Sequence, residues 1–421
     1  MIIKIFYILF ISNSLESKLI RKDIFTKHCY SLPESAKKDR FIGIKQAFRV
    51  FKTLWKREYI KNNELSENCL YVVFKSDINS KKQYIEEQSG VKTEYGIYKN
   101  SILAYSSIFQ KIIYTLLINI LFLLIIPIIF FKSRNRIQLA LFPEHIVGIL
   151  LISSNLIKAK CKNLYFFHTH EPEANLLSKI LMLSGINIIK IPNSNPLFMY
   201  NKNILANEII LTIQYQKEEL GFYNKFTNNN IKYWHPEFLE NFYNINFNSI
   251  NNKSIAYYSH ASWIRLKEDH NIPYFNELEI EIDLLNKIKS SNYFNNKDVT
   301  ICLHPKEKSS SEIIEKAYKY YADIFGKKVK FLNYSENSYN SFNKFNLGFG
   351  AFSSVLIERI HCGYRTILFT ANLDEFPLNR SKFGYFTTNN IQELENKINI
   401  GINMRCDIFF QNHFSYTYKI V

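Results

Sequence analysis

The chain has 421 residues, which at about 150 residues per domain is material for two or three domains and excludes a single small binding module. Hydrophobic residues make up 47% and charged residues 21%, proportions that allow a sizeable core and exclude disordered, collagen-like and coiled-coil chains. With 53 Lys and Arg against 37 Asp and Glu, the formal net charge is +16. We therefore expect an anionic partner, which charge alone leaves open between a lipid surface, a nucleic acid and a phosphorylated substrate.

The N-terminal segment and the cysteines bear on the cellular compartment. Residues 2–11 are apolar apart from one lysine, and no small-residue cleavage site follows them, so we interpret the segment as a buried β-strand rather than a signal peptide. The six cysteines form no Cys-x-x-Cys pair. Their scatter argues against a zinc site and against a secreted disulfide framework, and it fits a reducing cytoplasm.

Short apolar runs without alternation, each followed by a longer amphipathic segment, recur along the chain. This pattern is typical of parallel strands covered by helices on both faces, so the sequence predicts an α/β fold. A helix is expected at 178–183. The predicted strands are 2–11, 69–74, 137–142, 164–168, 186–191 and 209–213 in the first half, and 254–258, 299–303, 329–332, 347–349 and 366–369 in the second.

The two halves are separated by residues 228–252, which are rich in Asn and lack periodicity. Such a composition is typical of a linker. The sequence therefore predicts an N-terminal domain over 1–235 and a C-terminal domain over 253–421.

Two segments indicate contact with a membrane. Residues 112–131 form the longest apolar stretch and match the roughly 20 residues that a spanning helix needs. A single crossing would separate strands of one sheet, so we favour a monotopic helix kinked at Pro127, with a crossing or hairpin and a buried core helix as alternatives. Residues 41–59 combine Lys and Arg with apolar side chains at helical spacing, which suits anionic headgroups or an ordinary solvated helix.

A histidine follows the predicted strand 299–303. Because it follows this strand, His304 is expected at the carboxyl edge of the second sheet, where ligands bind in open α/β folds. Pro305 prevents strand pairing beyond this point, which leaves His304 and Lys306 free to meet phosphate charge. The plain alternative is a strand-terminating proline beside a surface histidine.

A second motif combines a strand, a glycine turn and a helix that begins near Ser353 or Ser354. Serine at a helix start caps free backbone N–H groups, and these groups together with the helix dipole form an anion site. A nucleotide phosphate fits such a site, with Glu358 one turn further along. A capped helix without a ligand is the alternative.

The loop after the first strand of the second domain carries further polar side chains. In a doubly wound sheet this turn commonly faces the ligand, so Ser259, Ser262 and Arg265 could hold a diphosphate or a sugar carboxylate. Equally, Trp263 could belong to the core and Arg265 could be an ordinary surface charge.

A strand that ends in His-Pro, followed by a Ser-Ser helix start and a glutamate, resembles the C-terminal domain of bacterial GT-B sialyltransferases and polysialyltransferases. It is more distantly similar to the CDP-glycerol-dependent teichoic acid polymerases. The resemblance implies a GT-B-like fold, in which two Rossmann-type domains face each other across a cleft. It also implies that His304 contacts the donor phosphate and assists the leaving CMP, that Ser353 and Ser354 bind the same phosphate, and that Glu358 contacts the ribose.

The general base departs from that family. The sialyltransferases carry an acidic-acidic-Gly motif in the N-terminal domain, which this chain lacks. His168, His170 and Glu171 follow a predicted strand and by type can remove the proton of an acceptor hydroxyl. No third ligand completes a metal site there, and a loop that only positions the acceptor is the remaining alternative.

Together these features predict an inverting glycosyltransferase of capsule or lipopolysaccharide biosynthesis that moves a sugar to a surface polysaccharide or a lipid-linked glycan. CMP-sialic acid or a related nonulosonate is the favoured donor. The alternatives are a CDP-glycerol or CDP-ribitol polyol-phosphate transferase and, in another class, a non-enzymatic basic protein bound to a membrane or to nucleic acid. Because no nucleic-acid motif is found, we expect no nucleic-acid partner. We expect neither a cofactor nor a metal, and we expect an anionic membrane surface as partner at the cytoplasmic face of the bacterial membrane.

Overall fold

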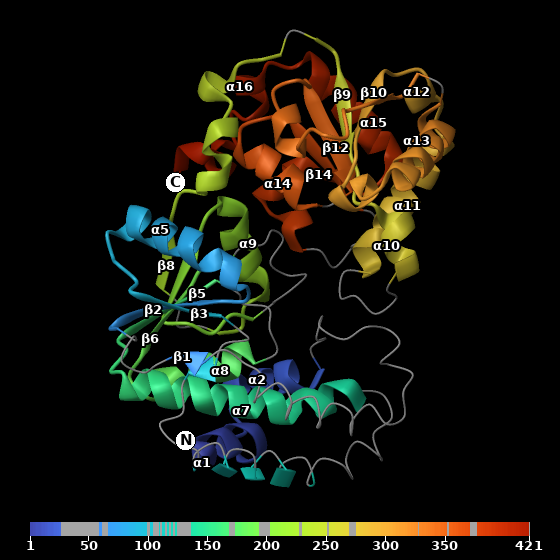
Figure 1. Cartoon of the computed structure of the whole chain (residues 1–421). Coiled ribbons are helices and arrows are strands. Elements are labelled where there is room, and N and C mark those ends of the chain that lie inside the picture. The colour runs from blue at the N-terminus through green and yellow to red at the C-terminus, as the bar shows by residue number, and fades with distance from the viewer. Residues whose placement is uncertain are drawn as a thin grey trace. The chain divides into compact units, whose positions relative to one another are not determined.

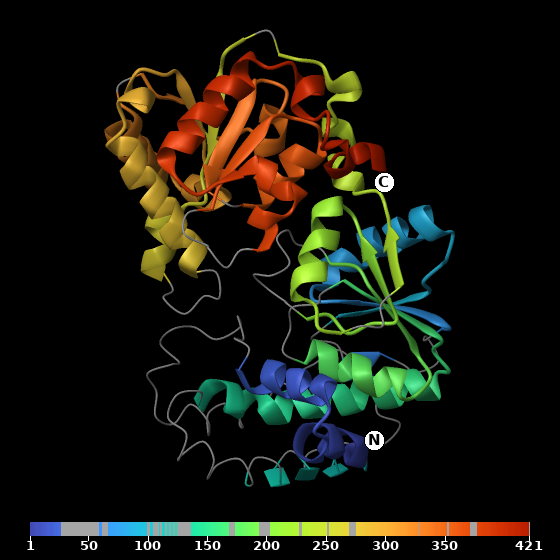
Figure 2. The same ribbon diagram turned by 180° about the vertical axis from the view of Figure 1, so that it is seen from behind.

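The computed structural model describes residues 1–26, 59–60, 66–98, 102–103, 109, 112–113, 116–117, 119–120, 123, 136–167, 173–192, 203–226, 230–250, 252–268, 275–326, 328–351, 353–370 and 377–420. Figures 1 and 2 show the chain from opposite sides. It divides into two compact units, and each has a parallel sheet with helices. The first unit comprises Met1–Asn193, Asn203–Ile210 and Asn224–Lys232, and the second comprises Ser194–Lys202, Leu211–Tyr223 and Tyr233–Val421.

The sheet of the first unit has the strand order β3-β2-β5-β6-β7-β8. Its strands are β2 (Asn68–Val72), β3 (Tyr95–Tyr98), β5 (Asn163–Phe166), β6 (Asn187–Lys190), β7 (Glu208–Leu211) and β8 (Asn230–Tyr233), and a separate parallel pair is formed by β1 (Tyr59–Ile60) and β4 (Ile102–Leu103). The pairs from β3 to β7 are parallel. The central strands are buried along most of their length, as continuous apolar runs require.

The helices of the first unit are α1 (Ile2–Phe6), which continues as a π-helical turn (Tyr7–Ile11), α2 (Leu15–Thr26), α5 (Ile78–Ser89), α7 (Arg136–Lys158) and α8 (Ala174–Met182). The prediction of a strand at 2–11 is wrong. Ile5, Ile8 and Leu9 are buried while their neighbours are exposed, so the segment buries one helical face instead of the two faces of a central strand. The strand predicted at 137–142 is also wrong, because this short apolar run is the beginning of α7 and periodicity cannot distinguish the two.

The second sheet has the order β11-β10-β9-β12-β13-β14, and all its pairs are parallel. Its strands are β9 (Ile255–Tyr258), β10 (Val299–Cys302), β11 (Lys330–Phe331), β12 (Leu347–Ala351), β13 (Thr366–Phe369) and β14 (Thr387–Thr388). Numbered along the chain, this is the 3-2-1-4-5-6 order of the Rossmann fold. The predicted α/β class, with two Rossmann-like sheets, is therefore confirmed.

The helices of the second unit are α9 (Gln214–Tyr223), α10 (Ser262–Glu268), α11 (Phe275–Lys289), α12 (Asn292–Asn295), α13 (Ser311–Phe325), α14 (Ser354–His361), α15 (Ile391–Asn403) and α16 (Cys406–Phe409). The stretch 228–252 is not an irregular linker throughout, because it contains β8 and two 3-10 turns, Glu237–Phe242 and Ile245–Phe247. Leu239 and Phe247 from these turns are buried in the core of the second unit. Phe242 and Tyr243 pack against the same core with the spacing of one helical turn from Leu239, a pattern too short to predict an element.

Two predicted membrane segments lie largely outside the described residues. Of 41–59 only Tyr59 is described, and of 112–131 only a few helical positions are described. Within the ranges given above, no helix combines the length and the hydropathy that a bilayer crossing needs.

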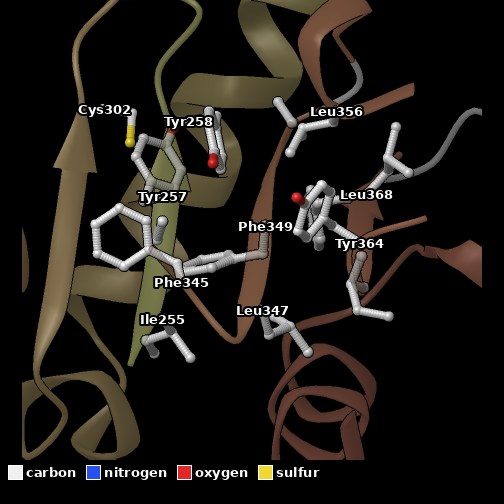
Figure 3. Close-up of a cluster of buried hydrophobic side chains, with 14 of the residues drawn as sticks. Ile255, Tyr257, Tyr258, Cys302, Phe345, Leu347, Phe349, Leu356, Tyr364 and Leu368 are labelled. Carbon is white, nitrogen blue, oxygen red and sulfur yellow. The ribbon is translucent and has the colours of Figure 1, made fainter. Parts of the chain in front are cut away.

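Residues of β9 and β12 belong to the hydrophobic core of the second unit, which holds these two strands in place. Figure 3 shows Tyr257, Tyr258 and Phe349 among its buried side chains. Arg359 of α14 is fully buried and donates to the carbonyl oxygens of Phe342 (2.8 Å) and Phe345 (2.7 Å). Two of its nitrogens are thus paired with the carbonyl groups of the segment before β12, and a third hydrogen bond, to the Tyr258 hydroxyl at 3.3 Å, connects α14 with β9.

Candidate functional site

The candidate site lies at the carboxyl ends of three neighbouring strands. β9 pairs with β10 on one side and with β12 on the other. Strands that follow β9 in the chain are therefore added first on one side of it and then, from β12 onward, on the other side. Ligands of open α/β sheets bind at such a switch point. Because neighbouring strands are about 4.8 Å apart, the ends of β10 and β12 are roughly 10 Å apart with the end of β9 between them.

The loop after β9 turns sharply into α10. Ala261 has a φ of 58°, which is uncommon for a residue with a side chain. The Ser259 Oγ accepts a hydrogen bond from the Ala261 backbone N–H at 2.9 Å, and Ser259 N–H donates to Cys302 O at 3.0 Å. The loop is therefore held against β10 in a conformation that costs energy, as is frequent at binding sites.

His260 lies at the centre of this loop. Its Nδ1 is buried and, among the described residues, has no hydrogen-bond partner. Burial, together with Arg265 and His304, holds the pKa of His260 well below its usual value, so the ring is neutral at pH 7. The Arg265 guanidinium donates to His260 O at 3.2 Å. We did not predict a role for His260 from the sequence, although its position directly after a strand gives the same signal as that of His304.

His304 follows β10, as predicted. Its Nδ1 accepts a hydrogen bond from the Lys306 backbone N–H at 3.1 Å, and its ring centroid lies 6.3 Å from that of His260. Burial, with further contributions from Arg265 and two lysines, lowers the pKa of His304 to about 4. At pH 7 the ring is neutral, and because Nδ1 is an acceptor its proton is on Nε2. His304 can therefore donate a hydrogen bond to an anion, whose charge would raise the pKa of the ring.

The helix α14 begins at Ser354, with Ser353 as the residue before its first turn, as predicted. The expected cap is wrong in its detail, because the Ser353 side chain makes no capping hydrogen bond. Its Oγ is buried and, in the part of the chain that the structure describes, is unpaired. A helix N-terminus beside an unused hydroxyl can bind an anion. Ser354 is exposed.

The other predicted donor-binding residues differ in their surroundings. Ser259 and Ser262 are buried in the loop after β9, and the Ser262 Oγ has no partner among the described residues. Lys306 is exposed. Glu358 is buried in α14, where its carboxylate accepts a hydrogen bond from the Tyr339 hydroxyl at 2.9 Å. The structure thus places His304, Ser259, Ser262, Arg265 and Ser353 at one edge of the sheet, and Glu358 one turn further into α14.

The predicted base candidates, His168, His170 and Glu171, lie outside the described residues. Beside them, Glu173 precedes α8, and its carboxylate lies 3.1 Å from Nδ1 of His145 on α7. Both side chains are buried. This pair was not predicted, because His145 is distant in the sequence and no local pattern marks it. A carboxylate at this distance fixes the orientation of an imidazole.

No protein-family model matches the chain, and no curated protein matches it either. Among solved structures the chain is similar to HepE of Anabaena in complex with UDP and glucose, with 15% identity and a TM-score of 0.34 over 63% of this chain and 76% of that chain. It is also similar to the wall teichoic acid polymerase TagF, with 10% identity and a TM-score of 0.35 over 89% and 94%. A third similar structure is UDP-GlcNAc 2-epimerase from Neisseria meningitidis bound to UDP-GlcNAc. The identity is 11% and the TM-score 0.38, over 85% of this chain and 93% of that chain. TM-scores this low transfer neither an activity nor a substrate to this chain.

Proposed function

We propose that the chain is an inverting glycosyltransferase of the GT-B type and that the edge of the second sheet binds the phosphate of its nucleotide-sugar donor. One observation carries the proposal: a neutral imidazole with its proton on Nε2 and a serine hydroxyl at a helix start, which has no partner among the described residues, follow two strands that flank β9. His304, the beginning of α14 and Arg265 all supply donors or positive charge. A phosphate group accepts from all of them.

In the transfer, the bond between the anomeric carbon and the donor phosphate oxygen breaks, and its electron pair leaves with the nucleotide. The Nε2–H of His304 and the N–H groups at the start of α14 stabilise the charge that develops on this phosphate. A hydroxyl oxygen of the acceptor forms the new bond on the opposite face of the sugar. The proton of that hydroxyl goes to a base, which we assign to His168, His170 or Glu171.

The two predicted domains take separate tasks in this proposal. Residues 253–421 bind the donor, and residues 1–235 bind a surface polysaccharide or a lipid-linked glycan. CMP-sialic acid or a related nonulosonate is the favoured donor, because the His-Pro and Ser-Ser motifs resemble those of the sialyltransferases. Ser259, Ser262, Lys306, Ser354 and Glu358 complete the donor site.

The test compares nucleotide binding and sugar transfer in the wild type, His304→Ala and Ser353→Ala. We expect CMP to raise the melting temperature of the wild type and to bind about tenfold more weakly to each variant, since a hydrogen bond to a charged group contributes about 1.5 kcal/mol or more. Ser290→Ala, at an exposed position after α11, is the matched control and should bind CMP like the wild type. Undiminished transfer in His304→Ala would refute the site.

A donor screen separates the remaining possibilities. Transfer of glycerol phosphate from CDP-glycerol would establish the polyol-phosphate transferase instead. Binding of an oligonucleotide with a steep salt dependence, without any response to CMP, CDP or UDP, would establish the non-enzymatic alternative.

We further propose that the protein contacts an anionic membrane surface at the cytoplasmic face. Large apolar side chains of α1 and the turn after it are exposed, among them Ile3 (83%), Phe6 (55%) and Phe10 (52%). In residues 109–123 six of the described apolar positions are likewise exposed and share the spacing of one helix face: Phe109, Ile112, Ile113, Leu116, Ile120 and Leu123. Leu117, by contrast, is half-buried. Figures 1 and 2 both show the two segments at the same end of the first unit. Apolar side chains with aromatic members suit the boundary between headgroups and acyl chains.

A further inference from the structure

Two buried carboxylates lie beneath the loops that follow β9 and β10. Glu281 belongs to α11, and Glu307 belongs to the 3-10 turn Pro305–Lys308. Both are fully buried. Burying a carboxylate is costly unless it is hydrogen-bonded, so the partners of these two groups indicate what they hold.

Glu281 holds the strained loop after β9. Its Oε1 accepts from the His260 backbone N–H (2.6 Å) and from the Tyr257 hydroxyl (2.6 Å), and its Oε2 accepts from the Ser262 backbone N–H (2.9 Å). The two backbone donors flank Ala261, the residue with positive φ. A single side chain from another helix thus fixes the sharpest bend of the loop.

Glu307 holds the His304 loop and connects it with the first loop. Its Oε2 accepts from the His304 backbone N–H (2.8 Å), and its Oε1 accepts from Trp263 Nε1 (2.6 Å) and from the Tyr321 hydroxyl (2.8 Å). Trp263 lies on α10, directly after the first loop. The Tyr321 hydroxyl also lies 2.6 Å from the Ser259 Oγ. Glu307 is therefore connected with the loop after β9 twice, through Trp263 and through Tyr321.

The chemistry of these donors favours a carboxyl group, with two acceptor oxygens, at position 307. A backbone N–H and an indole N–H can only donate, and they approach different oxygens. A glutamine offers one acceptor oxygen, so its amide group would face one of these donors. Burial and Glu281 raise the pKa of Glu307, while the hydrogen bonds from its partners favour the charged form.

We propose that Glu307, supported by Glu281, is a positioning residue that keeps the His304 imidazole in its Nε2–H tautomer and at a fixed spacing from the loop after β9. It acts through the backbone: it fixes the turn in which the Lys306 N–H meets Nδ1 of His304. The bound anion would then meet a donor that needs no rearrangement. The importance of this arrangement for transfer rests on the proposed function, but the arrangement itself exists without a ligand.

The experiment uses the full chain labelled with ¹⁵N-histidine, with the His304 signals assigned by comparison with His304→Gln. In the wild type we expect a neutral Nε2–H tautomer that titrates near pH 4. The charged groups that face this ring are Arg265 of α10 and Lys306 and Lys308 of its own turn, and the neutral His260 lies beside it. In Glu307→Gln we expect a mixture of tautomers, a pKa shifted toward the usual value, and about tenfold weaker CMP binding.

Trp263→Phe provides a second variant for the case that Glu307→Gln does not fold. It removes the indole N–H that donates to Glu307 and retains an aromatic side chain. It should move the His304 pKa in the same direction by a smaller amount. Glu312→Gln, at an exposed position in α13, is the matched control and should leave the His304 signals unchanged. A lower melting temperature in both variants with wild-type His304 tautomer and pKa would overturn the proposal, because it would show a structural role alone. The NMR measurement needs no nucleotide, so a protein that binds no CMP would refute the proposed function while the positioning role is still decided.

Discussion

His361 shows how a single buried ring links stability to pH. The side chain is 1% exposed at the end of α14, and burial, followed by the charge of His235, lowers its pKa to about 3. An unfolded chain binds a proton at this ring near pH 6.5, whereas the folded chain does not. Stability is therefore lost as the pH falls below 6.5, and the loss continues to about pH 3.

We expect His361→Leu to reduce this loss. Between pH 7.5 and 5.5 the wild type should lose about 1.4 kcal/mol more of its free energy of unfolding than the variant, from the proton that only the unfolded state binds. Urea unfolding at the two pH values measures the difference. His304 and His260 titrate in the same direction and remain in both proteins, so they cancel. Equal losses in the two proteins would contradict the assignment of the proton to His361.

The positions of His304 and Ser353 relative to the strand and helix ends have a local signal and agree with the structure, whereas contacts between distant elements were not predicted. Pro305 marks the end of a strand and so locates His304, and the serine pair locates the start of α14. The sequence offers no comparable signal for Glu281, whose partners come from other elements, and for Glu307 only the contact with His304 is local, because Trp263 and Tyr321 belong to other helices. Nor does it show that the Ser353 hydroxyl has no partner within the described part of the chain, which depends on the packing around the helix start.

The element that most constrains the site is β12, because one of its glycines lies against the end of β9. A Cβ at Gly350 would lie 2.7 Å from the Tyr258 carbonyl oxygen, which belongs to the central strand and cannot move away. We expect Gly350→Ala to destabilise the protein by about 1–3 kcal/mol and to weaken CMP binding, since it separates the two strand ends that carry the site.

The matched control for this change is Gly221→Ala in α9, where no atom of the described residues lies within 4 Å of the added Cβ. There the higher helix propensity of alanine should stabilise the protein by up to about 1 kcal/mol. Thermal unfolding and CMP titration of both variants check the pair. A Gly350→Ala protein as stable as the wild type would show that β9 and β12 are not held as closely as described.

Strands buried on both faces were the most predictable elements. β9 and β13 are buried along their whole length and β10 at every residue except Thr300, and all three agree with strands predicted from apolar runs. The same composition misled at 2–11 and 137–142, where the chain forms helices. Strands with little apolar content, such as β8 (Asn230–Tyr233) and β14 (Thr387–Thr388), were missed because pairing rather than composition defines them.

At the scale of the whole molecule, the charge of +16 and the exposed apolar helix predict how the protein meets a bilayer. We expect it to co-sediment with vesicles that contain phosphatidylglycerol, and to do so less in high salt or with phosphatidylcholine alone, since the charge term is screened. The double variant Phe6→Ser, Phe10→Ser should bind about tenfold more weakly, because it removes two partly exposed rings from the contact.

Ile408→Ser is the control for that experiment, since this residue of α16 is 49% exposed in the second unit and is expected to bind vesicles like the wild type. Gel filtration of the same proteins distinguishes a lipid contact from self-association. Wild-type binding by the double variant, or a change in its oligomeric state without a change in vesicle binding, would contradict the membrane contact.

The position of β9 between β10 and β12 also limits how far the geometry of the proposed site can vary. β10 and β12 are both hydrogen-bonded to β9 in parallel, so the distance between them cannot increase unless these hydrogen bonds break. In the proposed function, a bulkier or smaller sugar would therefore be accommodated by changes of side chains around the site, while the distance between the groups proposed to bind the phosphate stays the same.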